Sequence, residues 1–283
     1  MMETIKIAAI SVCSTANRTV NIDNACLAVK EAAQNGAQWV QLPEMLCFLG
    51  DYSQIYDMAE DEGGPIYQKF SQLARDLGIV LFAGTMGERP PKKRQQISAA
   101  GYKKVFNTAY VFGRDGSQIT KYRKTHLFNL LNEDGSRQYC ESDGYIAGDE
   151  HCVFEVDGFN VGLAVCYDLR FPSFFARMHA IKPFDVLALP SAFTAKTGEA
   201  HWELLLKARA VEWQCYVFAA NQTGQHSSDK QSWGQSMVVD PWGSVLSETK
   251  RKPEIAYATI SKSQIAEVRQ KLPALSNRIP ALY

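Results

Sequence analysis

The sequence predicts a single α/β domain in which two layers of sheet are covered by helices. In the first third of the chain, strand-like and helix-like segments alternate in the order β-α-β-α-β, which is typical of a sheet flanked by helices. The second half repeats a similar order of elements. No stretch rich in proline, glycine or serine separates the two halves, so we expect one domain over residues 1–283.

The elements of the first third follow from the spacing of apolar residues and from signals at helix ends. Two segments carry an apolar residue at every third or fourth position, and each stops at a glycine, Gly36 or Gly78. Pro65 suits the first turn of the second helix, because an N–H there has no helical partner. Short apolar runs between the helices indicate buried strands. The predicted strands are residues 5–10, 39–42 and 79–83, and the helices are residues 18–35 and 65–77.

Turn residues and further apolar runs define the rest of the chain. Arg114-Asp115-Gly116-Ser117 and Pro241-Trp242-Gly243 are hairpin turns between paired strands. The basic run at residues 90–94 is interpreted as a solvated loop. Residues 129–150 are polar and predict a long surface loop, and loops of that length are usually functional. The predicted strands are residues 105–112, 118–122, 161–165, 185–189, 216–220, 236–240, 244–248 and 255–260, with helices from 172, at 200–213 and at 262–271, and a loop at 190–198.

Composition excludes several classes of partner. The 283 residues are 46% hydrophobic and 21% charged, with a formal net charge of zero, so nothing favours binding to nucleic acid or to an anionic membrane surface. The seven cysteines are scattered without a C-x-x-C pair, which fits a reducing cytoplasm better than a disulfide framework or a zinc site. No apolar run approaches the roughly 18 to 20 residues that span a bilayer. Residues 7–13, with Glu3 ahead of them, do not resemble a secretory leader.

Cys166 is the strongest candidate for a reactive residue. It follows the buried strand predicted at residues 161–165 and precedes a helix that begins at Pro172. Ligands bind at this edge of open α/β sheets. The alternative is a structural cysteine, since free cysteine is among the most buried residue types. The charges of Asp168 and Arg170 favour a site, because charged residues rarely lie at a dry strand end without a partner.

Two ways of activating this thiol stay open from the residues alone. The sequence has no G-x-S-x-G elbow, phosphate loop or H-E-x-x-H zinc helix. A Cys–His pair with His126 or His201 is one alternative. The other is a carboxylate base in a dry cleft, for which Glu44 is well placed after a strand, with Lys124 available to hold an oxyanion. For Glu44 and Lys124 individually, a surface charge or a salt bridge is the competing interpretation.

Three segments resemble the signature segments of the nitrilase (carbon–nitrogen hydrolase) superfamily. Their order and wide spacing agree, and the resemblance runs from residue 5 to residue 283. It implies a four-layer α-β-β-α sandwich, one carbon–nitrogen hydrolase domain, and a catalytic triad of Glu44, Lys124 and Cys166. A second glutamate is assigned to Glu141. The segments are Leu42-Pro43-Glu44, Tyr122-Arg123-Lys124-Thr125-His126-Leu127 and Cys166-Tyr167-Asp168-Leu169-Arg170-Phe171.

Within that superfamily the chain most resembles the amidase branch that hydrolyses deaminated glutathione, with the ω-amidases next. Residues 214–217 and 236–243 carry the closer likeness, whereas residues 190–193, 197–198 and 200–203 are similar in both groups. Two positions depart from the branch: Gln235 replaces the usual histidine, and Met45 replaces a small residue. Neither departure touches the triad, so both bear on the substrate alone.

The resemblance further implies a small-molecule amide substrate and a thioester on Cys166. The backbone N–H of Tyr167 would share the oxyanion with Lys124, and Arg170 would hold the carboxylate of a 2-oxo acid. Phe193 and Thr197 match positions of the substrate pocket. This chemistry requires neither a metal ion nor an organic cofactor.

The resemblance also implies a homodimer or a higher even oligomer, paired through the helices next to the nucleophile. Residues 171–175 are rich in aromatic rings that offer apolar area for such a contact, and an intramolecular core is the alternative place for those rings. A function of another class, a non-catalytic dimeric adaptor, is the alternative to an enzyme.

Overall fold

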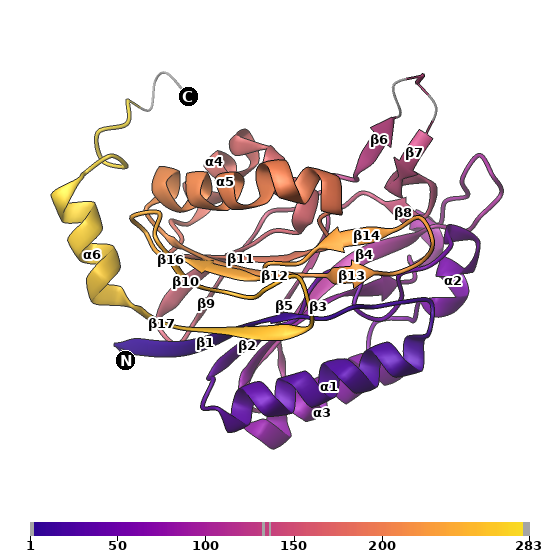
Figure 1. Ribbon diagram of the computed structural model, residues 1–283, viewed down its shortest axis with the longest axis horizontal. Helices are drawn as coiled ribbons and strands as arrows, with labels where there is room; N and C mark the ends of the chain where they lie inside the picture. The colour runs from indigo at the N-terminus through magenta and orange to yellow at the C-terminus, as the bar shows by residue number, and fades with distance from the viewer. Residues whose placement is uncertain (1–2, 132–133, 136, 280–283) are drawn as a thin grey trace.

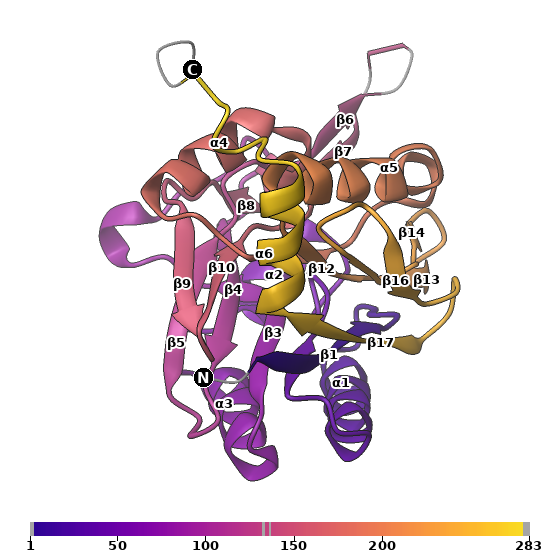
Figure 2. The same ribbon diagram turned by 90° about the vertical axis from the view of Figure 1, so that its left-hand side faces the viewer.

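The computed structural model describes residues 3–131, 134–135 and 137–279, which form four layers (Figure 1). Two sheets lie face to face in the middle. Helices α1 (Arg18–Gln34) and α3 (Pro65–Leu77) cover one outer face, and α4 (Pro172–Ile181) and α5 (Ala195–Trp213) cover the other. Figure 2 shows the same layers from the side, with α6 (Lys262–Lys271) in front of them. The α-β-β-α sandwich expected from the resemblance is confirmed.

The first sheet contains the β-α-β-α-β unit predicted from the sequence. Its strands run in the order β17-β1-β2-β3-β4-β5, and β8 pairs with β4. Strands β1, β2 and β3 are parallel, because α1 and α3 form the crossovers between them. The last strand, β17, returns antiparallel to β1. The bounds are β1 (Thr4–Ser11), β2 (Trp39–Gln41), β3 (Val80–Glu88), β4 (Val105–Phe112), β5 (Gln118–Arg123), β8 (Tyr145–Ile146) and β17 (Glu254–Ser261).

The second sheet has the order β16-β15-β12-β11-β10-β9. Its centre, β10 to β12, is parallel, and α4 and α5 connect these strands. Strand β9, which the sequence did not predict, pairs antiparallel with β10. The bounds are β9 (Cys152–Val156), β10 (Phe159–Leu163), β11 (Val186–Ser191), β12 (Tyr216–Asn221), β15 (Met237–Val239) and β16 (Val245–Glu248), with a separate hairpin of β13 (Thr223–Gln225) and β14 (Gln231–Trp233).

The two sheets pack through large side chains on their inner faces. The rings of Phe82 and Phe218 lie 5.6 Å apart between centroids, at an edge-to-face angle. The amide of Gln41, fully buried, donates a 2.9 Å hydrogen bond to the backbone oxygen of Phe218 in the opposite sheet. Aromatic pairs and hydrogen bonds between facing sheets hold two layers in one register. The strand ends of both sheets are therefore fixed relative to each other.

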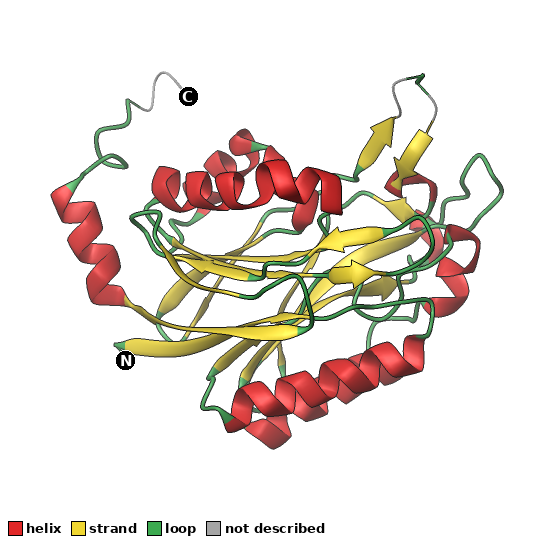
Figure 3. Cartoon of the chain, in the orientation of Figure 1, coloured by secondary structure: helices red, strands yellow, loops and turns green. Residues whose placement is uncertain are grey.

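The long loop predicted at residues 129–150 is not a loop throughout. It contains a hairpin of β6 (Asn129–Leu131) and β7 (Arg137–Cys140), the 3-10 turn η3 (Glu141–Asp143) and β8 (Figure 3). These strands have only two to four residues each, too few to show the apolar alternation that marks a strand in sequence. Glu133, where we expected the substrate-facing part of the loop to begin, lies outside the described residues.

One expected helix boundary is wrong, and of the two places considered for the rings of residues 171–175 the structure favours the intramolecular core. Helix α5 begins at Ala195 rather than at residue 200, so part of the loop expected at residues 190–198 is its first turn. Phe174 and Phe175 are buried in the core rather than available for a dimer contact, whereas Ile181 is 67% exposed. Helix α4 turns its aromatic rings onto the sheet, because that face covers β9 and β10.

Candidate active site

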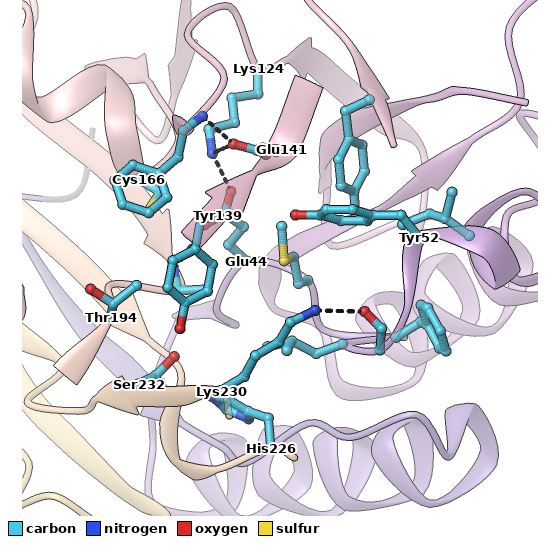
Figure 4. Close-up of a pocket in the computed structure, with 18 of the residues that line it drawn as sticks. Glu44, Tyr52, Lys124, Tyr139, Glu141, Cys166, Thr194, His226, Lys230 and Ser232 are labelled. Atoms are coloured by element: carbon cyan, nitrogen blue, oxygen red, sulfur yellow. Dashed lines mark hydrogen bonds and ion pairs between the residues drawn. The ribbon is translucent and has the colours of Figure 1, made fainter. Parts of the chain in front are cut away.

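Three strand ends from two sheets converge on one pocket. Glu44 follows β2 and Lys124 follows β5 in the first sheet, whereas Cys166 follows β10 in the second. The backbone N–H of Glu44 donates a 3.3 Å hydrogen bond to Ser191 of β11, so this segment is anchored to the opposite sheet. Figure 4 shows the three side chains together with Glu141, which reaches the pocket from η3. All four predicted catalytic residues therefore lie in one place.

The ammonium of Lys124 lies between two carboxylates. It donates to Oε1 of Glu44 at 2.8 Å and to Oε2 of Glu141 at 2.7 Å, and the three side chains are almost completely buried. Burial alone would lower the pKa of Lys124, but the charges of Glu141 and Glu44 outweigh it and raise that pKa well above its ordinary value. The lysine thus keeps its charge in a dry site, where a cation interacts most strongly.

Backbone and amide donors fix the two carboxylates. The side-chain amide of Asn107 donates to Glu44 at 2.8 Å and to Glu141 at 3.1 Å, and the N–H of Ala192 donates to the other oxygen of Glu44 at 2.9 Å. The N–H of Phe128 donates to Glu141 at 2.6 Å. Sequence reasoning missed Asn107, although a polar residue inside the apolar strand β4 was a usable signal.

Cys166 occupies a constrained turn. Its φ of 47° lies in the left-handed region, which non-glycine residues rarely adopt, and it begins the 3-10 turn η4 (Cys166–Arg170). Only 7% of the residue is exposed. Burial raises the pKa of the Cys166 thiol well above its ordinary value, and the negative charge of Glu44 raises it further. The resting thiol is therefore protonated at neutral pH and needs a base to react.

The side chain of Asp168 stabilises the turn that carries Cys166 through hydrogen bonds. Its fully buried carboxylate accepts hydrogen bonds from the N–H of Val165 at 2.9 Å, the hydroxyl of Tyr122 at 2.8 Å and the N–H of His126 at 3.0 Å. The Nδ1 of His126 lies 2.7 Å from the same carboxylate. The carboxylate of Asp168, which follows Cys166 closely in sequence, therefore has a structural role in stabilising this turn.

The Cys–His alternative has no support in this arrangement. His126 is occupied by Asp168 and stacks on Phe171, with ring centroids 3.7 Å apart. The Nδ1 of His201 lies 3.3 Å from both terminal nitrogens of Arg170. Neither histidine lines a pocket that contains Cys166. The carboxylate alternative, with Glu44 beside the thiol, is the one that the geometry favours.

Two pockets meet at Cys166. The larger, about 640 Å³, is lined by Glu44, Lys124 and Glu141. The smaller, about 200 Å³, is lined by the four predicted substrate-binding residues, Tyr167, Arg170, Phe193 and Thr197. The guanidinium of Arg170 lies 5.1 Å from the ring centroid of Phe193. The sequence-based pocket residues are therefore brought together, but on one side of the thiol only.

Sequence reasoning missed most of the larger pocket. Its outer wall includes residues from short hairpins, a loop and the 3-10 turn η1 (Tyr52–Gln54), namely Tyr52, Tyr139, His226, Lys230 and Ser232. Lys230 stands in a run of polar residues, where a lysine resembles any solvated charge. No pattern in the sequence separates it from the exposed lysines of the surface.

Two other features are absent from the described residues. These residues contain no cluster of three or more histidine, cysteine, aspartate or glutamate side chains arranged to hold a metal ion. They also include no helix that is both long and apolar enough to cross a membrane.

Comparison with known proteins identifies the family. The family model described as carbon-nitrogen hydrolase matches residues 6–270. The omega-amidase NIT2 of Mus musculus is 38% identical over 284 residues, which cover 100% of this chain and 98% of that protein. The deaminated glutathione amidase of Homo sapiens is 37% identical over 280 residues, covering 98% of this chain and 83% of that protein. The crystal structure of the C. elegans NitFhit protein superposes with a TM-score of 0.90 at 34% identity, covering 100% of this chain and 66% of that longer chain. The resemblance drawn from the three motifs is confirmed, and the chain is a hydrolase that belongs to the carbon-nitrogen hydrolase family.

Proposed function

We propose that this chain is an amidase that hydrolyses deaminated glutathione to 2-oxoglutarate and cysteinylglycine. The supporting observation is the pair of unequal pockets that meet at Cys166. The smaller holds Arg170, a partner for the carboxylate of a 2-oxo acid. The larger opens to solvent and extends from Cys166 to Lys230 and Ser232, so a leaving group larger than ammonia can project into it. An ω-amidase acting on 2-oxoglutaramate or succinamate expels only ammonia and has no use for that space.

The identity of the relatives does not choose between these substrates. One relative is named an omega-amidase and another a deaminated glutathione amidase, at 38% and 37% identity. Residues 214–217 and 236–243 resemble the second group more closely, and the size of the larger pocket points the same way. The ω-amidase remains the alternative that the experiment below must exclude.

In the acylation step, Glu44 takes the proton of the Cys166 thiol as the sulfur attacks the amide carbonyl. The oxyanion is stabilised by Lys124 and by the backbone N–H of Tyr167, and a donor of this kind is worth about 10²–10³ in rate. When the tetrahedral intermediate collapses, the C–N bond breaks. Glu44 passes the proton taken from the thiol to the leaving nitrogen, directly or by way of Glu141, and is a carboxylate again when the thioester remains on Cys166.

In the deacylation step, Glu44 removes a proton from a water molecule that attacks the thioester. The C–S bond breaks, the carboxylic acid leaves, and the sulfur regains its proton. Asn107 and the N–H of Ala192 keep Glu44 oriented through both steps, because they hold its two oxygens separately. The positions of these donors support a site whose geometry is set before substrate arrives.

A comparison of two substrates tests the proposal. We expect kcat/KM for deaminated glutathione to exceed that for 2-oxoglutaramate, because both substrates present the same acyl group and only the first fills the larger pocket. Release of ammonia and of cysteinylglycine can be measured separately with the same enzyme preparation. A preference of tenfold or more for 2-oxoglutaramate would show that the ω-amidase alternative is correct.

A further inference from the structure

The larger pocket contains a second cation. Lys230 lines it, and Figure 4 shows Lys230, His226 and Ser232 on one side with Lys124 and Glu141 on the opposite side. The ammonium donates a 3.0 Å hydrogen bond to the backbone oxygen of Gly50 and lies 5.2 Å from the ring centroid of Tyr52. These two contacts fix the position of the Lys230 ammonium at the border of the pocket.

The two lysines of the larger pocket differ in their ion pairing. Lys124 is held between two carboxylates, whereas no ion pair in the described part of the chain joins Lys230 to an acidic group. The acidic residues nearest to it in sequence and in space hydrogen-bond to neighbours of their own: Asp51 accepts from the N–H of Ser53 at 2.7 Å, and Asp229 from the hydroxyl of Ser227 at 2.7 Å. Both carboxylates interact electrostatically with Lys230, but none of the described residues forms an ion pair with its ammonium, which is therefore open to a further anion.

We expect the leaving group to lie in the larger pocket, because the residues that protonate it line that pocket. The proton for the leaving nitrogen comes from Glu44 or Glu141, and both line the larger pocket. The acyl group then occupies the smaller pocket, where Arg170 faces it. A leaving group that extends from Cys166 away from Lys124 runs toward the wall formed by Lys230 and Ser232.

We propose that Lys230 binds a carboxylate at the far end of the leaving group, so that the enzyme selects amides with an anionic group at both ends. The inference rests on the proposed function and names the chemistry by which the same site recognises its substrate. A dipeptide with a free C-terminal carboxylate meets this requirement, and ammonia does not. The ammonium acts as a point charge, and the hydroxyl of Ser232 is available as a second donor.

The first experiment compares deaminated glutathione with its C-terminal glycinamide, which has the same shape without the terminal charge. Wild-type enzyme should favour the acid. In Lys230→Gln the ratio of kcat/KM between acid and glycinamide should fall by about tenfold to a hundredfold, the effect of losing one charged hydrogen bond. Lys230→Arg should restore most of the ratio. Lys93→Gln, an exposed lysine of the 3-10 turn η2 (Lys92–Arg94), serves as the matched control and should keep the wild-type ratio.

A second measurement separates this inference from the proposed function. With 2-oxoglutaramate as reporter substrate, alanylglycine should inhibit the wild type at least about tenfold better than alanylglycinamide, and Lys230→Gln should abolish that difference. The reporter works even if the enzyme proves to be an ω-amidase. Equal inhibition of the wild type by the two dipeptides, or equal losses on acid and glycinamide substrates in Lys230→Gln, would overturn the role of Lys230 whichever substrate is preferred.

Discussion

The side-chain amide of Asn107 lies 2.8 Å from Oε1 of Glu44, and its nitrogen also donates to Glu141. An uncharged amide is the one short side chain that donates two hydrogen bonds through a single nitrogen and brings no charge of its own. It therefore holds two carboxylates side by side around the ammonium of Lys124 without altering the charge of the site.

Asn107→Asp replaces this donor by a third carboxylate of the same shape. Repulsion between like charges should favour protonation of the buried carboxyl groups, so the acid limb of the kcat/KM profile should move to higher pH. Displacement of Glu44 should lower kcat by about 10²-fold. Asn24→Asp, exposed on α1, is the control and should leave the profile in place. An unshifted acid limb in Asn107→Asp would contradict the role assigned to this residue.

Cys166→Ala should abolish turnover while the fold survives, because a strand-end thiol contributes little packing. In the wild type, mass spectrometry of enzyme quenched during turnover should find the acyl group on the peptide that contains Cys166. Cys152→Ala removes another buried thiol outside both pockets and serves as the control. Activity that persists in Cys166→Ala, with the adduct on Cys140 or Cys152, would disprove the assignment.

The pH dependence of alkylation should reveal how Glu44 acts on the thiol. Because burial and the charge of Glu44 raise the pKa of Cys166, its labelling by iodoacetamide should still increase as the pH passes 9.0, the ordinary value for a cysteine. Glu44→Gln removes the charge and should lower the pKa of Cys166, so labelling at pH 8 should become faster while turnover is lost. Slower labelling in Glu44→Gln would mean that Glu44 assists alkylation as a general base more than its charge disfavours the thiolate.

Arg170→Ala should lower kcat/KM for 2-oxo acid amides by roughly tenfold to a hundredfold, the worth of one charged hydrogen bond. The loss should disappear when the substrate carboxylate is esterified. Arg177→Ala, an exposed arginine on α4, provides the matched control. Equal losses on acid and ester in Arg170→Ala would assign the residue to packing against Phe193 rather than to substrate.

The oligomeric state stays a prediction, and α5 offers the surface that tests it. Leu204 and Val211 are 66% and 48% exposed there, so a dimer paired through this face should dissociate in Leu204→Glu and Val211→Glu. Leu27→Glu on α1, where the leucine is 64% exposed, should leave the dimer intact. Light scattering at micromolar concentration gives the mass directly. A single 31.6 kDa species in the wild type would rule out pairing.

The fold was predictable where local signals and periodicity agree. Pro65 and Gly78 mark the two ends of α3, and the strands buried on both faces are continuous apolar runs. Glu44, Lys124 and Cys166 were predicted from motifs at strand ends and Glu141 from the family resemblance, and the structure brings the four side chains together. These features depend on short segments of chain, which a sequence displays directly.

The features that sequence reasoning missed depend on contacts between residues far apart in the chain or on backbone conformations that no short segment displays. Lys230 and Tyr52 belong to polar loops far apart in the chain and meet only because the strands beneath them are paired. Strands β6 and β7, of three and four residues, are too short to show a period of two. The left-handed conformation of Cys166 is imposed by its surroundings against the preference of the residue itself.

Glu44 and Lys124 project from one sheet and Cys166 from the other, so neither half of the chain holds a working fragment of the site. Enzymatic activity therefore requires that the two sheets are packed against each other, and secondary structure alone is not enough. In a denaturant titration, activity should vanish together with near-ultraviolet signals from the packed interface, where Phe82 meets Phe218. If the layers separate while the strands and helices persist, every catalytic residue is still present. The residues no longer lie together, so the chain is inactive.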